Sequence, residues 1–163
     1  MGALLDAVPA GGADHTEHHR DLATAAEAVP SLTAGVDYPT SATVTLSSAQ
    51  LLDLHNTPVT LVAAPGAGKY IAVHTVVGYV KFGTVEYVAG GDVNVVYSGE
   101  SGDPMASINP QRSADHIDTE SFGASLPASS VVNVPIVATA AQMTDGDGTV
   151  TFVVWYTIED VPA

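Results

Sequence analysis

The chain has 163 residues, and its 18 acidic residues against only 4 Lys and Arg give a formal net charge of −14 at pH 7. A surface this acidic repels nucleic-acid phosphates and anionic membrane headgroups, so no nucleic acid and no membrane is expected as a partner. Cysteine is absent from the sequence, which excludes disulfides, thiolate metal sites and cysteine nucleophiles. The length fits one domain with a short extension.

Residues 1–41 are rich in Ala, Gly and His and are predicted to form an N-terminal attachment or oligomerisation segment. Asp14 and Glu17 have the spacing of a capping box, so a helix is predicted over about 14–29, followed by an extended linker. A helix this short is marginal alone in water and needs packing, either on its own domain or against copies of itself. The predicted contact positions follow a 3/4 spacing: His15, His19, Leu22, Ala26 and Val29.

His15 and His19 are also the candidate metal ligands. They are four residues apart on one helical face, a spacing that lets two imidazoles bind one ion. In a trimer, one histidine from each subunit near the axis would supply three ligands. The interpretation we prefer is a polar or axis-packing start of the helix without a metal, and no cofactor is expected.

From residue 42 onward, Val, Thr, Tyr and Phe dominate short segments that Gly, Pro, Asp and Asn separate. This pattern is typical of an all-β protein. We predict an antiparallel β-sandwich, jelly-roll-like, over residues 42–163. The predicted strands are 42–46, 59–63, 70–82, 85–88, 93–98, 131–139 and 149–158, with a further short strand near 116–122. A bend or bulge is expected at Gly78.

One short helix interrupts the β pattern, over residues 48–54. Ser47 and Gln50 form a second capping box, the leucines that follow provide an apolar face, and Pro58 ends the helix. Such a helix would close one end of the sandwich.

The last predicted strand is apolar on both faces. Alternation places Val150, Phe152, Val154, Tyr156 and Ile158 on one face, and Val153 and Trp155 on the other. A sheet covered on both faces suits a sandwich that also contacts another subunit. Val153 and Trp155 are therefore predicted to lie in an oligomer interface.

Residues 99–130 form a long irregular tract, the kind of connection that is usually functional or wraps over a neighbour. It contains a run of acidic residues and one histidine that could supply the paired carboxylates of a glycosidase: Asp103, Asp115, His116, Asp118 and Glu120. A solvated charged loop is the interpretation we prefer.

Two glycine motifs resemble ligand-binding loops but lack required residues. Ala64–Lys69 (APGAGK) resembles the end of a phosphate-binding loop, but Ala63 replaces the first glycine and Tyr70 the hydroxyl residue. Asp145–Gly148 (DGDG) resembles the start of a calcium loop, but its twelfth position is Tyr156 instead of Glu. A tight glycine turn and an Asp-Gly hairpin turn are predicted instead. With no catalytic set evident, an enzyme is not expected.

The segment 46–97 resembles a domain that recurs in small structural proteins of tailed bacteriophages. The resemblance rests on Leu46–Leu52, Thr57–Val59, Leu61–Lys69 and Tyr87–Asp92, and it covers roughly residues 43–98. The segment 13–29 (ADHTEHHRDLATAAEAV) resembles the short His-rich helix near the N-terminus of phage fibre and minor tail proteins, where such a helix gathers three chains.

The resemblance implies a non-enzymatic virion structural protein, homotrimeric, of the surface fibre, knob or capsid decoration type. It would be assembled in the host cytoplasm and attach to other virion proteins, in the capsid or tail, through its N-terminal segment. The alternative is a module that binds host-surface carbohydrate, with Tyr38, Tyr79, Tyr87 or Trp155 as stacking platforms.

Overall fold

The computed structural model describes residues 39–99, 104–121 and 131–161. All of them belong to a unit that extends from Tyr38 to Ala163. The predicted helix over 14–29, with its contact positions His15, His19, Leu22, Ala26 and Val29, lies outside the described residues. The helix, the trimer contact and the metal ligands there therefore stay predictions.

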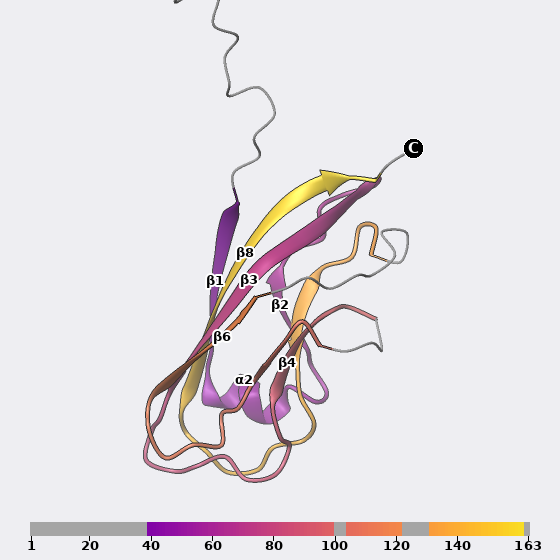
Figure 1. The fold of residues 1–163 in the computed structure, drawn as a ribbon. Helices are drawn as coiled ribbons and strands as arrows, with labels where there is room; N and C mark the ends of the chain where they lie inside the picture. The colour runs from indigo at the N-terminus through magenta and orange to yellow at the C-terminus, as the bar shows by residue number, and fades with distance from the viewer. Residues whose placement is uncertain (1–38, 100–103, 122–130, 162–163) are drawn as a thin grey trace, which may run out of the picture. The chain divides into compact units, whose positions relative to one another are not determined.

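The described residues form two antiparallel sheets of four strands each, with the orders β1-β8-β3-β6 and β2-β7-β4-β5 (Figure 1). We call them the first and the second sheet. The strand bounds are β1 (Thr40–Leu46), β2 (Val59–Val62), β3 (Lys69–Lys81), β4 (Val93–Tyr97), β5 (Ala106–Ile108), β6 (His116–Ser121), β7 (Ile136–Thr139) and β8 (Thr149–Asp160).

The strand pairing is that of a jelly roll. β1 pairs with β8, β2 with β7, β3 with β6 and β4 with β5, all antiparallel. These four pairs arise when one long antiparallel hairpin of eight strands is rolled into two facing sheets. The predicted all-β, jelly-roll-like sandwich is confirmed.

The core lies between the two sheets, and β4, β5 and the first half of β8 bury alternate residues toward it. In β8, Val150, Phe152 and Val154 are fully buried, as their predicted common face requires. The prediction is wrong for Ile158 of the same face, which is 43% exposed, whereas Tyr156 is partly buried against the core. Val93 and Val95 of β4 are also fully buried and belong to the same hydrophobic cluster from the opposite sheet.

The short helix α2 (Ser48–Asp53) connects the first sheet to the second at one end of the sandwich (Figure 1). Its capping box is present: Ser47 Oγ accepts from the Gln50 backbone N–H, and the Gln50 side chain accepts from the Ser47 backbone N–H. Leu51 and Leu54 are fully buried in the core cluster, so this helix is confirmed. The described residues contain no helix with the length and hydropathy to cross a membrane.

The irregularity in β3 is at His74, and the prediction of a bend at Gly78 is wrong. The register against β8 shifts between Val73 and Thr75, which leaves His74 as the extra residue of a bulge. Gly78 lies in regular pairing, and a side chain there would meet Ile108 of the opposite sheet at 2.6 Å. The glycine makes room for this close approach.

Two predicted elements differ from the structure, and one strand was not predicted. Residues 85–88 form no strand, and only an isolated bridge joins Val88 to Thr144. Of the predicted strand 131–139, only β7 is extended, because the chain turns first at Asn133, whose φ is 56°. β5 was not predicted, since three residues are too few to show an alternating pattern. β6, in contrast, lies where a short strand was expected.

Ala64–Lys69 forms a glycine turn between β2 and β3, as predicted, with φ values of 106° at Gly66 and 74° at Gly68. Other parts of the chain use its polar groups. The Gly66 N–H donates to Asn133 Oδ1 at 2.9 Å, and Gly68 O accepts from Val161 N–H at 2.9 Å. Lys69 Nζ lies 2.7 Å from Asp160 Oδ1. The motif therefore fastens the start of β3 to neighbouring segments.

Candidate functional site

The outer face of the first sheet, the face directed away from the core, is the candidate site. Three adjacent rows of residues lie across the strands there, and two of them include all four strands. We call these three rows the outer face, and none of their residues carries a charge at neutral pH. The rows are Ser41–Trp155–Thr75, Thr43–Val153–Val77–Thr119 and Thr45–Thr151–Tyr79–Ile117.

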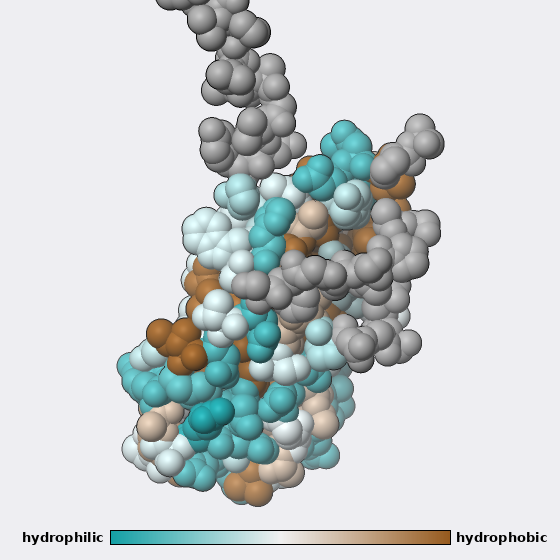
Figure 2. Space-filling view, in the orientation of Figure 1, coloured by the Kyte–Doolittle hydropathy of each residue, from teal (hydrophilic) through white to brown (hydrophobic). Residues whose placement is uncertain are grey.

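Large apolar side chains on this face are exposed, although they belong to a regular sheet. The exposed fraction is 43% for Trp155, 37% for Tyr79 and 64% for Ile117. Val153 and Trp155 face away from the core, as predicted from alternation, while their role in an interface stays a prediction. In the view of Figure 2, hydrophobic residues form separate groups among hydrophilic and weakly polar ones. A contact made by such a surface would be mixed, with apolar anchors among polar groups.

Hydroxyl groups surround these anchors. Thr45 Oγ1 and Thr151 Oγ1 form a hydrogen bond of 2.8 Å across β1 and β8. Thr43 and Thr119 are exposed at the two edge strands of the same middle row. The three rows can therefore donate and accept hydrogen bonds through uncharged groups, and the Asp115 carboxylate beside Tyr79 is a charge at their margin.

Tyr79 is held in place by Asp115. The Tyr79 hydroxyl donates to Asp115 Oδ2 at 3.0 Å, and the Phe82 N–H donates to Asp115 Oδ1 at 2.8 Å. The hydrogen bond to the carboxylate raises the pKa of Tyr79 above its ordinary value, because the bond is made by the protonated hydroxyl. The ring is thus oriented before any partner binds.

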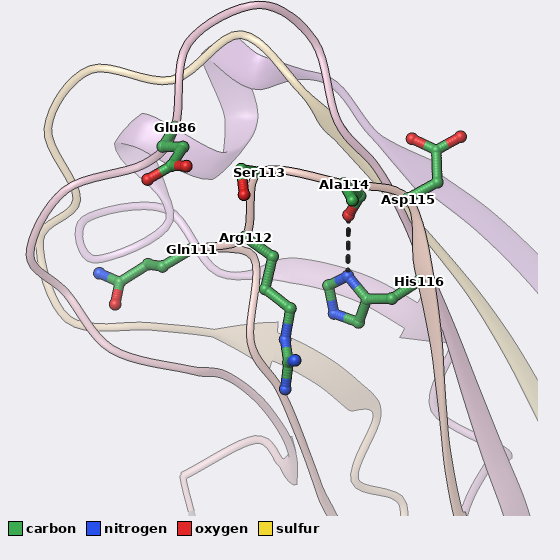
Figure 3. Close-up of a pocket in the computed structure, with 7 residues that line it drawn as sticks. All are labelled: Glu86, Gln111, Arg112, Ser113, Ala114, Asp115 and His116. Carbon is green, nitrogen blue, oxygen red and sulfur yellow. Dashed lines mark hydrogen bonds between the residues drawn. The ribbon is translucent and has the colours of Figure 1, made fainter.

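A polar pocket of about 450 Å³ lies at the start of β6, lined mainly by the segment that leads into this strand (Figure 3). His116 and Arg112 contribute side chains to it, whereas Asp115 lies on the other side of the strand. His116 Nδ1 is 3.4 Å from the Ala114 carbonyl oxygen, which can accept a hydrogen bond from a protonated Nδ1. His116 Nε2 is buried 3.3 Å from Asp118 Oδ2 without forming a hydrogen bond. The lining residues are Glu86, Gln111, Arg112, Ser113, Ala114, Asp115 and His116.

The acidic loop residues do not converge as paired carboxylates. Asp115 is on the outer side of the sheet, where Tyr79 and Phe82 hydrogen-bond both of its oxygens. Asp118 and Glu120 alternate onto the opposite side of β6. Asp103 lies outside the described residues. This part of the loop therefore forms the edge strand β6 and, at Asp115, hydrogen bonds that hold Tyr79 and Phe82 of the neighbouring strand and turn.

Tyr87 is wrong as a candidate stacking platform, because only 4% of it is exposed. Its hydroxyl donates to Gly148 O at 2.7 Å, and burial, followed by the charge of Asp147, raises the pKa of Tyr87 to about 12. The platform candidates that remain on the described surface are Tyr79 and Trp155. Tyr38 lies outside the described residues.

Asp145–Gly148 forms a turn, with φ of 55° at Asp145 and 87° at Gly146. The predicted hairpin is wrong, because the flanking strands β7 and β8 belong to different sheets. The Asp147 carboxylate instead accepts from the backbone N–H groups of Thr84 and Val85, at 2.7 and 2.9 Å. These donors stabilise the ionised form and lower the pKa of Asp147.

Comparison with known proteins adds no relative. No protein-family model matches the sequence, and no curated protein matches it significantly. Within the described ranges, no three His, Cys, Asp or Glu side chains are placed to hold a metal ion. The functional argument therefore rests on the outer face and on the two sheets that present it.

Proposed function

We propose that this chain is a structural protein of a bacteriophage particle, a homotrimeric surface fibre, knob or capsid decoration subunit attached through residues 1–41. Its role is assembly and not catalysis. The observation that carries the proposal is the outer face, where exposed Trp155, Tyr79 and Ile117 lie in three rows without a charged residue.

Charge explains why this face suits contact between copies. Two molecules of net charge −14 repel each other, and carboxylates opposed in an interface would add local repulsion. Interface cores are depleted in charged residues and enriched in aromatic ones. The outer face has this composition, and it is rigid because all four of its strands are paired in the sheet.

The fold supports the same proposal by analogy. The jelly roll recurs in viral capsid proteins, but also in lectins and cupins. Since one fold serves many functions, the topology raises the plausibility of a virion role without deciding it. The resemblance of residues 46–97 to phage structural proteins points in the same direction.

The oligomer is tested by sedimentation equilibrium of the full chain at micromolar concentration. We expect the mass of a trimer, and Val153→Asp in the middle row should shift it toward monomer. Val88→Asp is the matched control, because Val88 is 55% exposed but lies outside the face. If wild type is a monomer, the proposed trimer is wrong. If Val153→Asp is still a trimer, the outer face is excluded as the trimer contact.

The location is tested on intact particles. Cross-linking followed by mass spectrometry of purified virions should connect residues 1–41 to a capsid or tail protein. If the chain is expressed during infection but absent from purified particles, the virion role is wrong.

A second candidate function is binding of a neutral host glycan. Tyr79 and Trp155 share the outer face with several threonine hydroxyls, and aromatic faces with nearby hydroxyls are suited to sugar rings. A glycan array should then give hits that Trp155→Ala removes and Val88→Asp keeps. An array without hits would exclude this candidate.

A further inference from the structure

The free edge of β1 is the one sheet edge in the described structure without protection against pairing. Edge strands present unpaired N–H and C=O groups, which proteins usually guard with charges, prolines, bulges or shortness. β1 has seven residues, TSATVTL, with no charged residue and no proline. Its register with β8 runs from Thr40 to Leu46 without a shift. In Figure 1 it is the outermost strand of the first sheet.

The other three edges are each guarded. β6, the opposite edge of the first sheet, has His116, Asp118 and Glu120 at alternate positions. In the second sheet, β5 has only 3 residues. β2 has 4 residues and a register shift between Thr60 and Val62. Because the same sheet guards one edge and leaves the other open, the open edge is suited to receive a strand.

We propose that β1 pairs with β1 of a second copy of this chain, antiparallel about a twofold axis at Thr43. The two first sheets then join into one continuous sheet across both copies. The pairing is made by the free backbone edge of β1, so it does not need the trimer to form, although Ser41, Thr43 and Thr45 of β1 also belong to the outer face. If the trimer exists, the pairing connects one trimer to another.

The sequence of β1 is chemically self-complementary about Thr43. In this register Ser41 lies opposite Thr45 of the partner copy, and Thr43 lies opposite its own counterpart. Ala42 lies opposite Val44. Over the central five residues, hydroxyls thus meet hydroxyls on the outer side and apolar side chains meet apolar ones on the inner side. At the two ends Thr40 lies opposite Leu46, a mixed pair. Cross-strand Thr and Ser pairs stabilise sheets, and Thr45 already makes such a bond with Thr151 on its other flank.

Charge favours a second copy as the occupant. Like charges placed directly opposite each other in a sheet are destabilising. β1 contains no charged residue, although the chain as a whole carries a net charge of −14. The long-range repulsion between two copies is screened beyond about 8–10 Å at physiological salt, whereas the strand contact itself is made at about 5 Å.

The experiment is a charge swap at the axis, in the full chain, followed by sedimentation velocity over increasing concentration. Wild type should double its mass, from trimer to hexamer or from monomer to dimer. Thr43→Lys alone and Thr43→Glu alone should each abolish the doubling, because two like charges meet at the axis. An equimolar mixture of the two variants should restore it. Thr60→Lys, at an exposed threonine of the guarded edge β2 in the second sheet, is the control and should double like wild type.

A second measurement needs no variant. Hydrogen exchange of the β1 amides should slow as wild-type concentration rises, while exchange in β6 should not change. The proposal is overturned if wild type never doubles up to millimolar concentration, or if both Thr43 variants still double. If the mass doubles from monomer to dimer and no trimer forms, the proposed trimer is contradicted and the β1 pairing is supported. If the trimer forms but its mass never doubles, the proposed trimer is supported and the β1 pairing is wrong.

Discussion

Gly78 provides a quantitative test of the packing between the two sheets. It lies in β3, paired with Phe152 of β8 and Asp118 of β6, under Ile108 of the second sheet. A Cβ added at Gly78 would be 2.6 Å from both Cδ1 and Cγ1 of Ile108. Carbon atoms in good contact are about 3.5–4.0 Å apart. The substitution Gly78→Ala therefore places a methyl group roughly 1 Å inside contact distance.

Ile108 cannot move away without cost. It is fully buried, and its β-branched side chain has few rotamers. Overpacking of this kind costs about 1–3 kcal/mol. Replacing glycine by alanine in a strand stabilises the folded state by about 0.5–1 kcal/mol, because alanine loses less backbone conformational entropy on folding. We expect Gly78→Ala to lower the free energy of unfolding by a net of about 1–2 kcal/mol.

The assay is urea unfolding of the full chain, with the midpoint and slope fitted separately. Ile108→Ala alone should cost about 2–5 kcal/mol by leaving a cavity. In the double variant the new methyl fills part of that cavity, so the total cost should fall short of the sum by about 1 kcal/mol or more. A neutral or stabilising Gly78→Ala, or strictly additive costs, would refute the proposed contact.

Two further predictions concern titratable groups. Tyr87→Phe should cost about 1–3 kcal/mol, because it leaves the buried Gly148 carbonyl without its donor. Since the pKa of Tyr87 is raised from 10.0 to about 12, wild type should also lose stability between these pH values, and alkaline unfolding of Tyr87→Phe should lack this loss. Asp147→Asn should destabilise the chain at neutral pH, where the ionised carboxylate accepts its backbone donors. The folded-state pKa of Asp147 is lowered from 3.8, so this difference should shrink as the pH falls below 3.8, and a difference that persists in acid would contradict the assignment.

Much of the fold is visible in the sequence where alternation is long. β8 and β3 are long enough for the pattern of β-branched residues to show, and Ser47 with Gln50 marks the start of α2 unambiguously. The errors are in short or irregular segments. β5 has too few residues for a period, and the bulge at His74 depends on the register against β8, which the sequence does not specify.

The candidate site was predictable only in part. Alternation in β8 places Val153 and Trp155 on one face, and the structure confirms that placement. The membership of Tyr79 and Ile117 in the same face depends on β3 and β6 being neighbours, which is a property of the jelly-roll order. Likewise, only the strand order reveals that β1 is an edge. Properties of single strands could be predicted, whereas properties of their arrangement could not.

The charge distribution leads to a last prediction, on salt. Both proposed contacts, the outer face and the β1 edge, contain no charged residue, while each copy carries a net charge of −14. Salt therefore has no attractive ion pair to weaken at these contacts and acts mainly by screening the repulsion between copies. Self-association measured by sedimentation velocity should strengthen as sodium chloride rises from low to physiological concentration and then level off. The mass of Thr43→Lys should not double at any sodium chloride concentration, because salt only incompletely screens two charges held at about 5 Å. An association that weakens steadily with salt would mean that ion pairs hold the copies together, and both contacts would then be wrong.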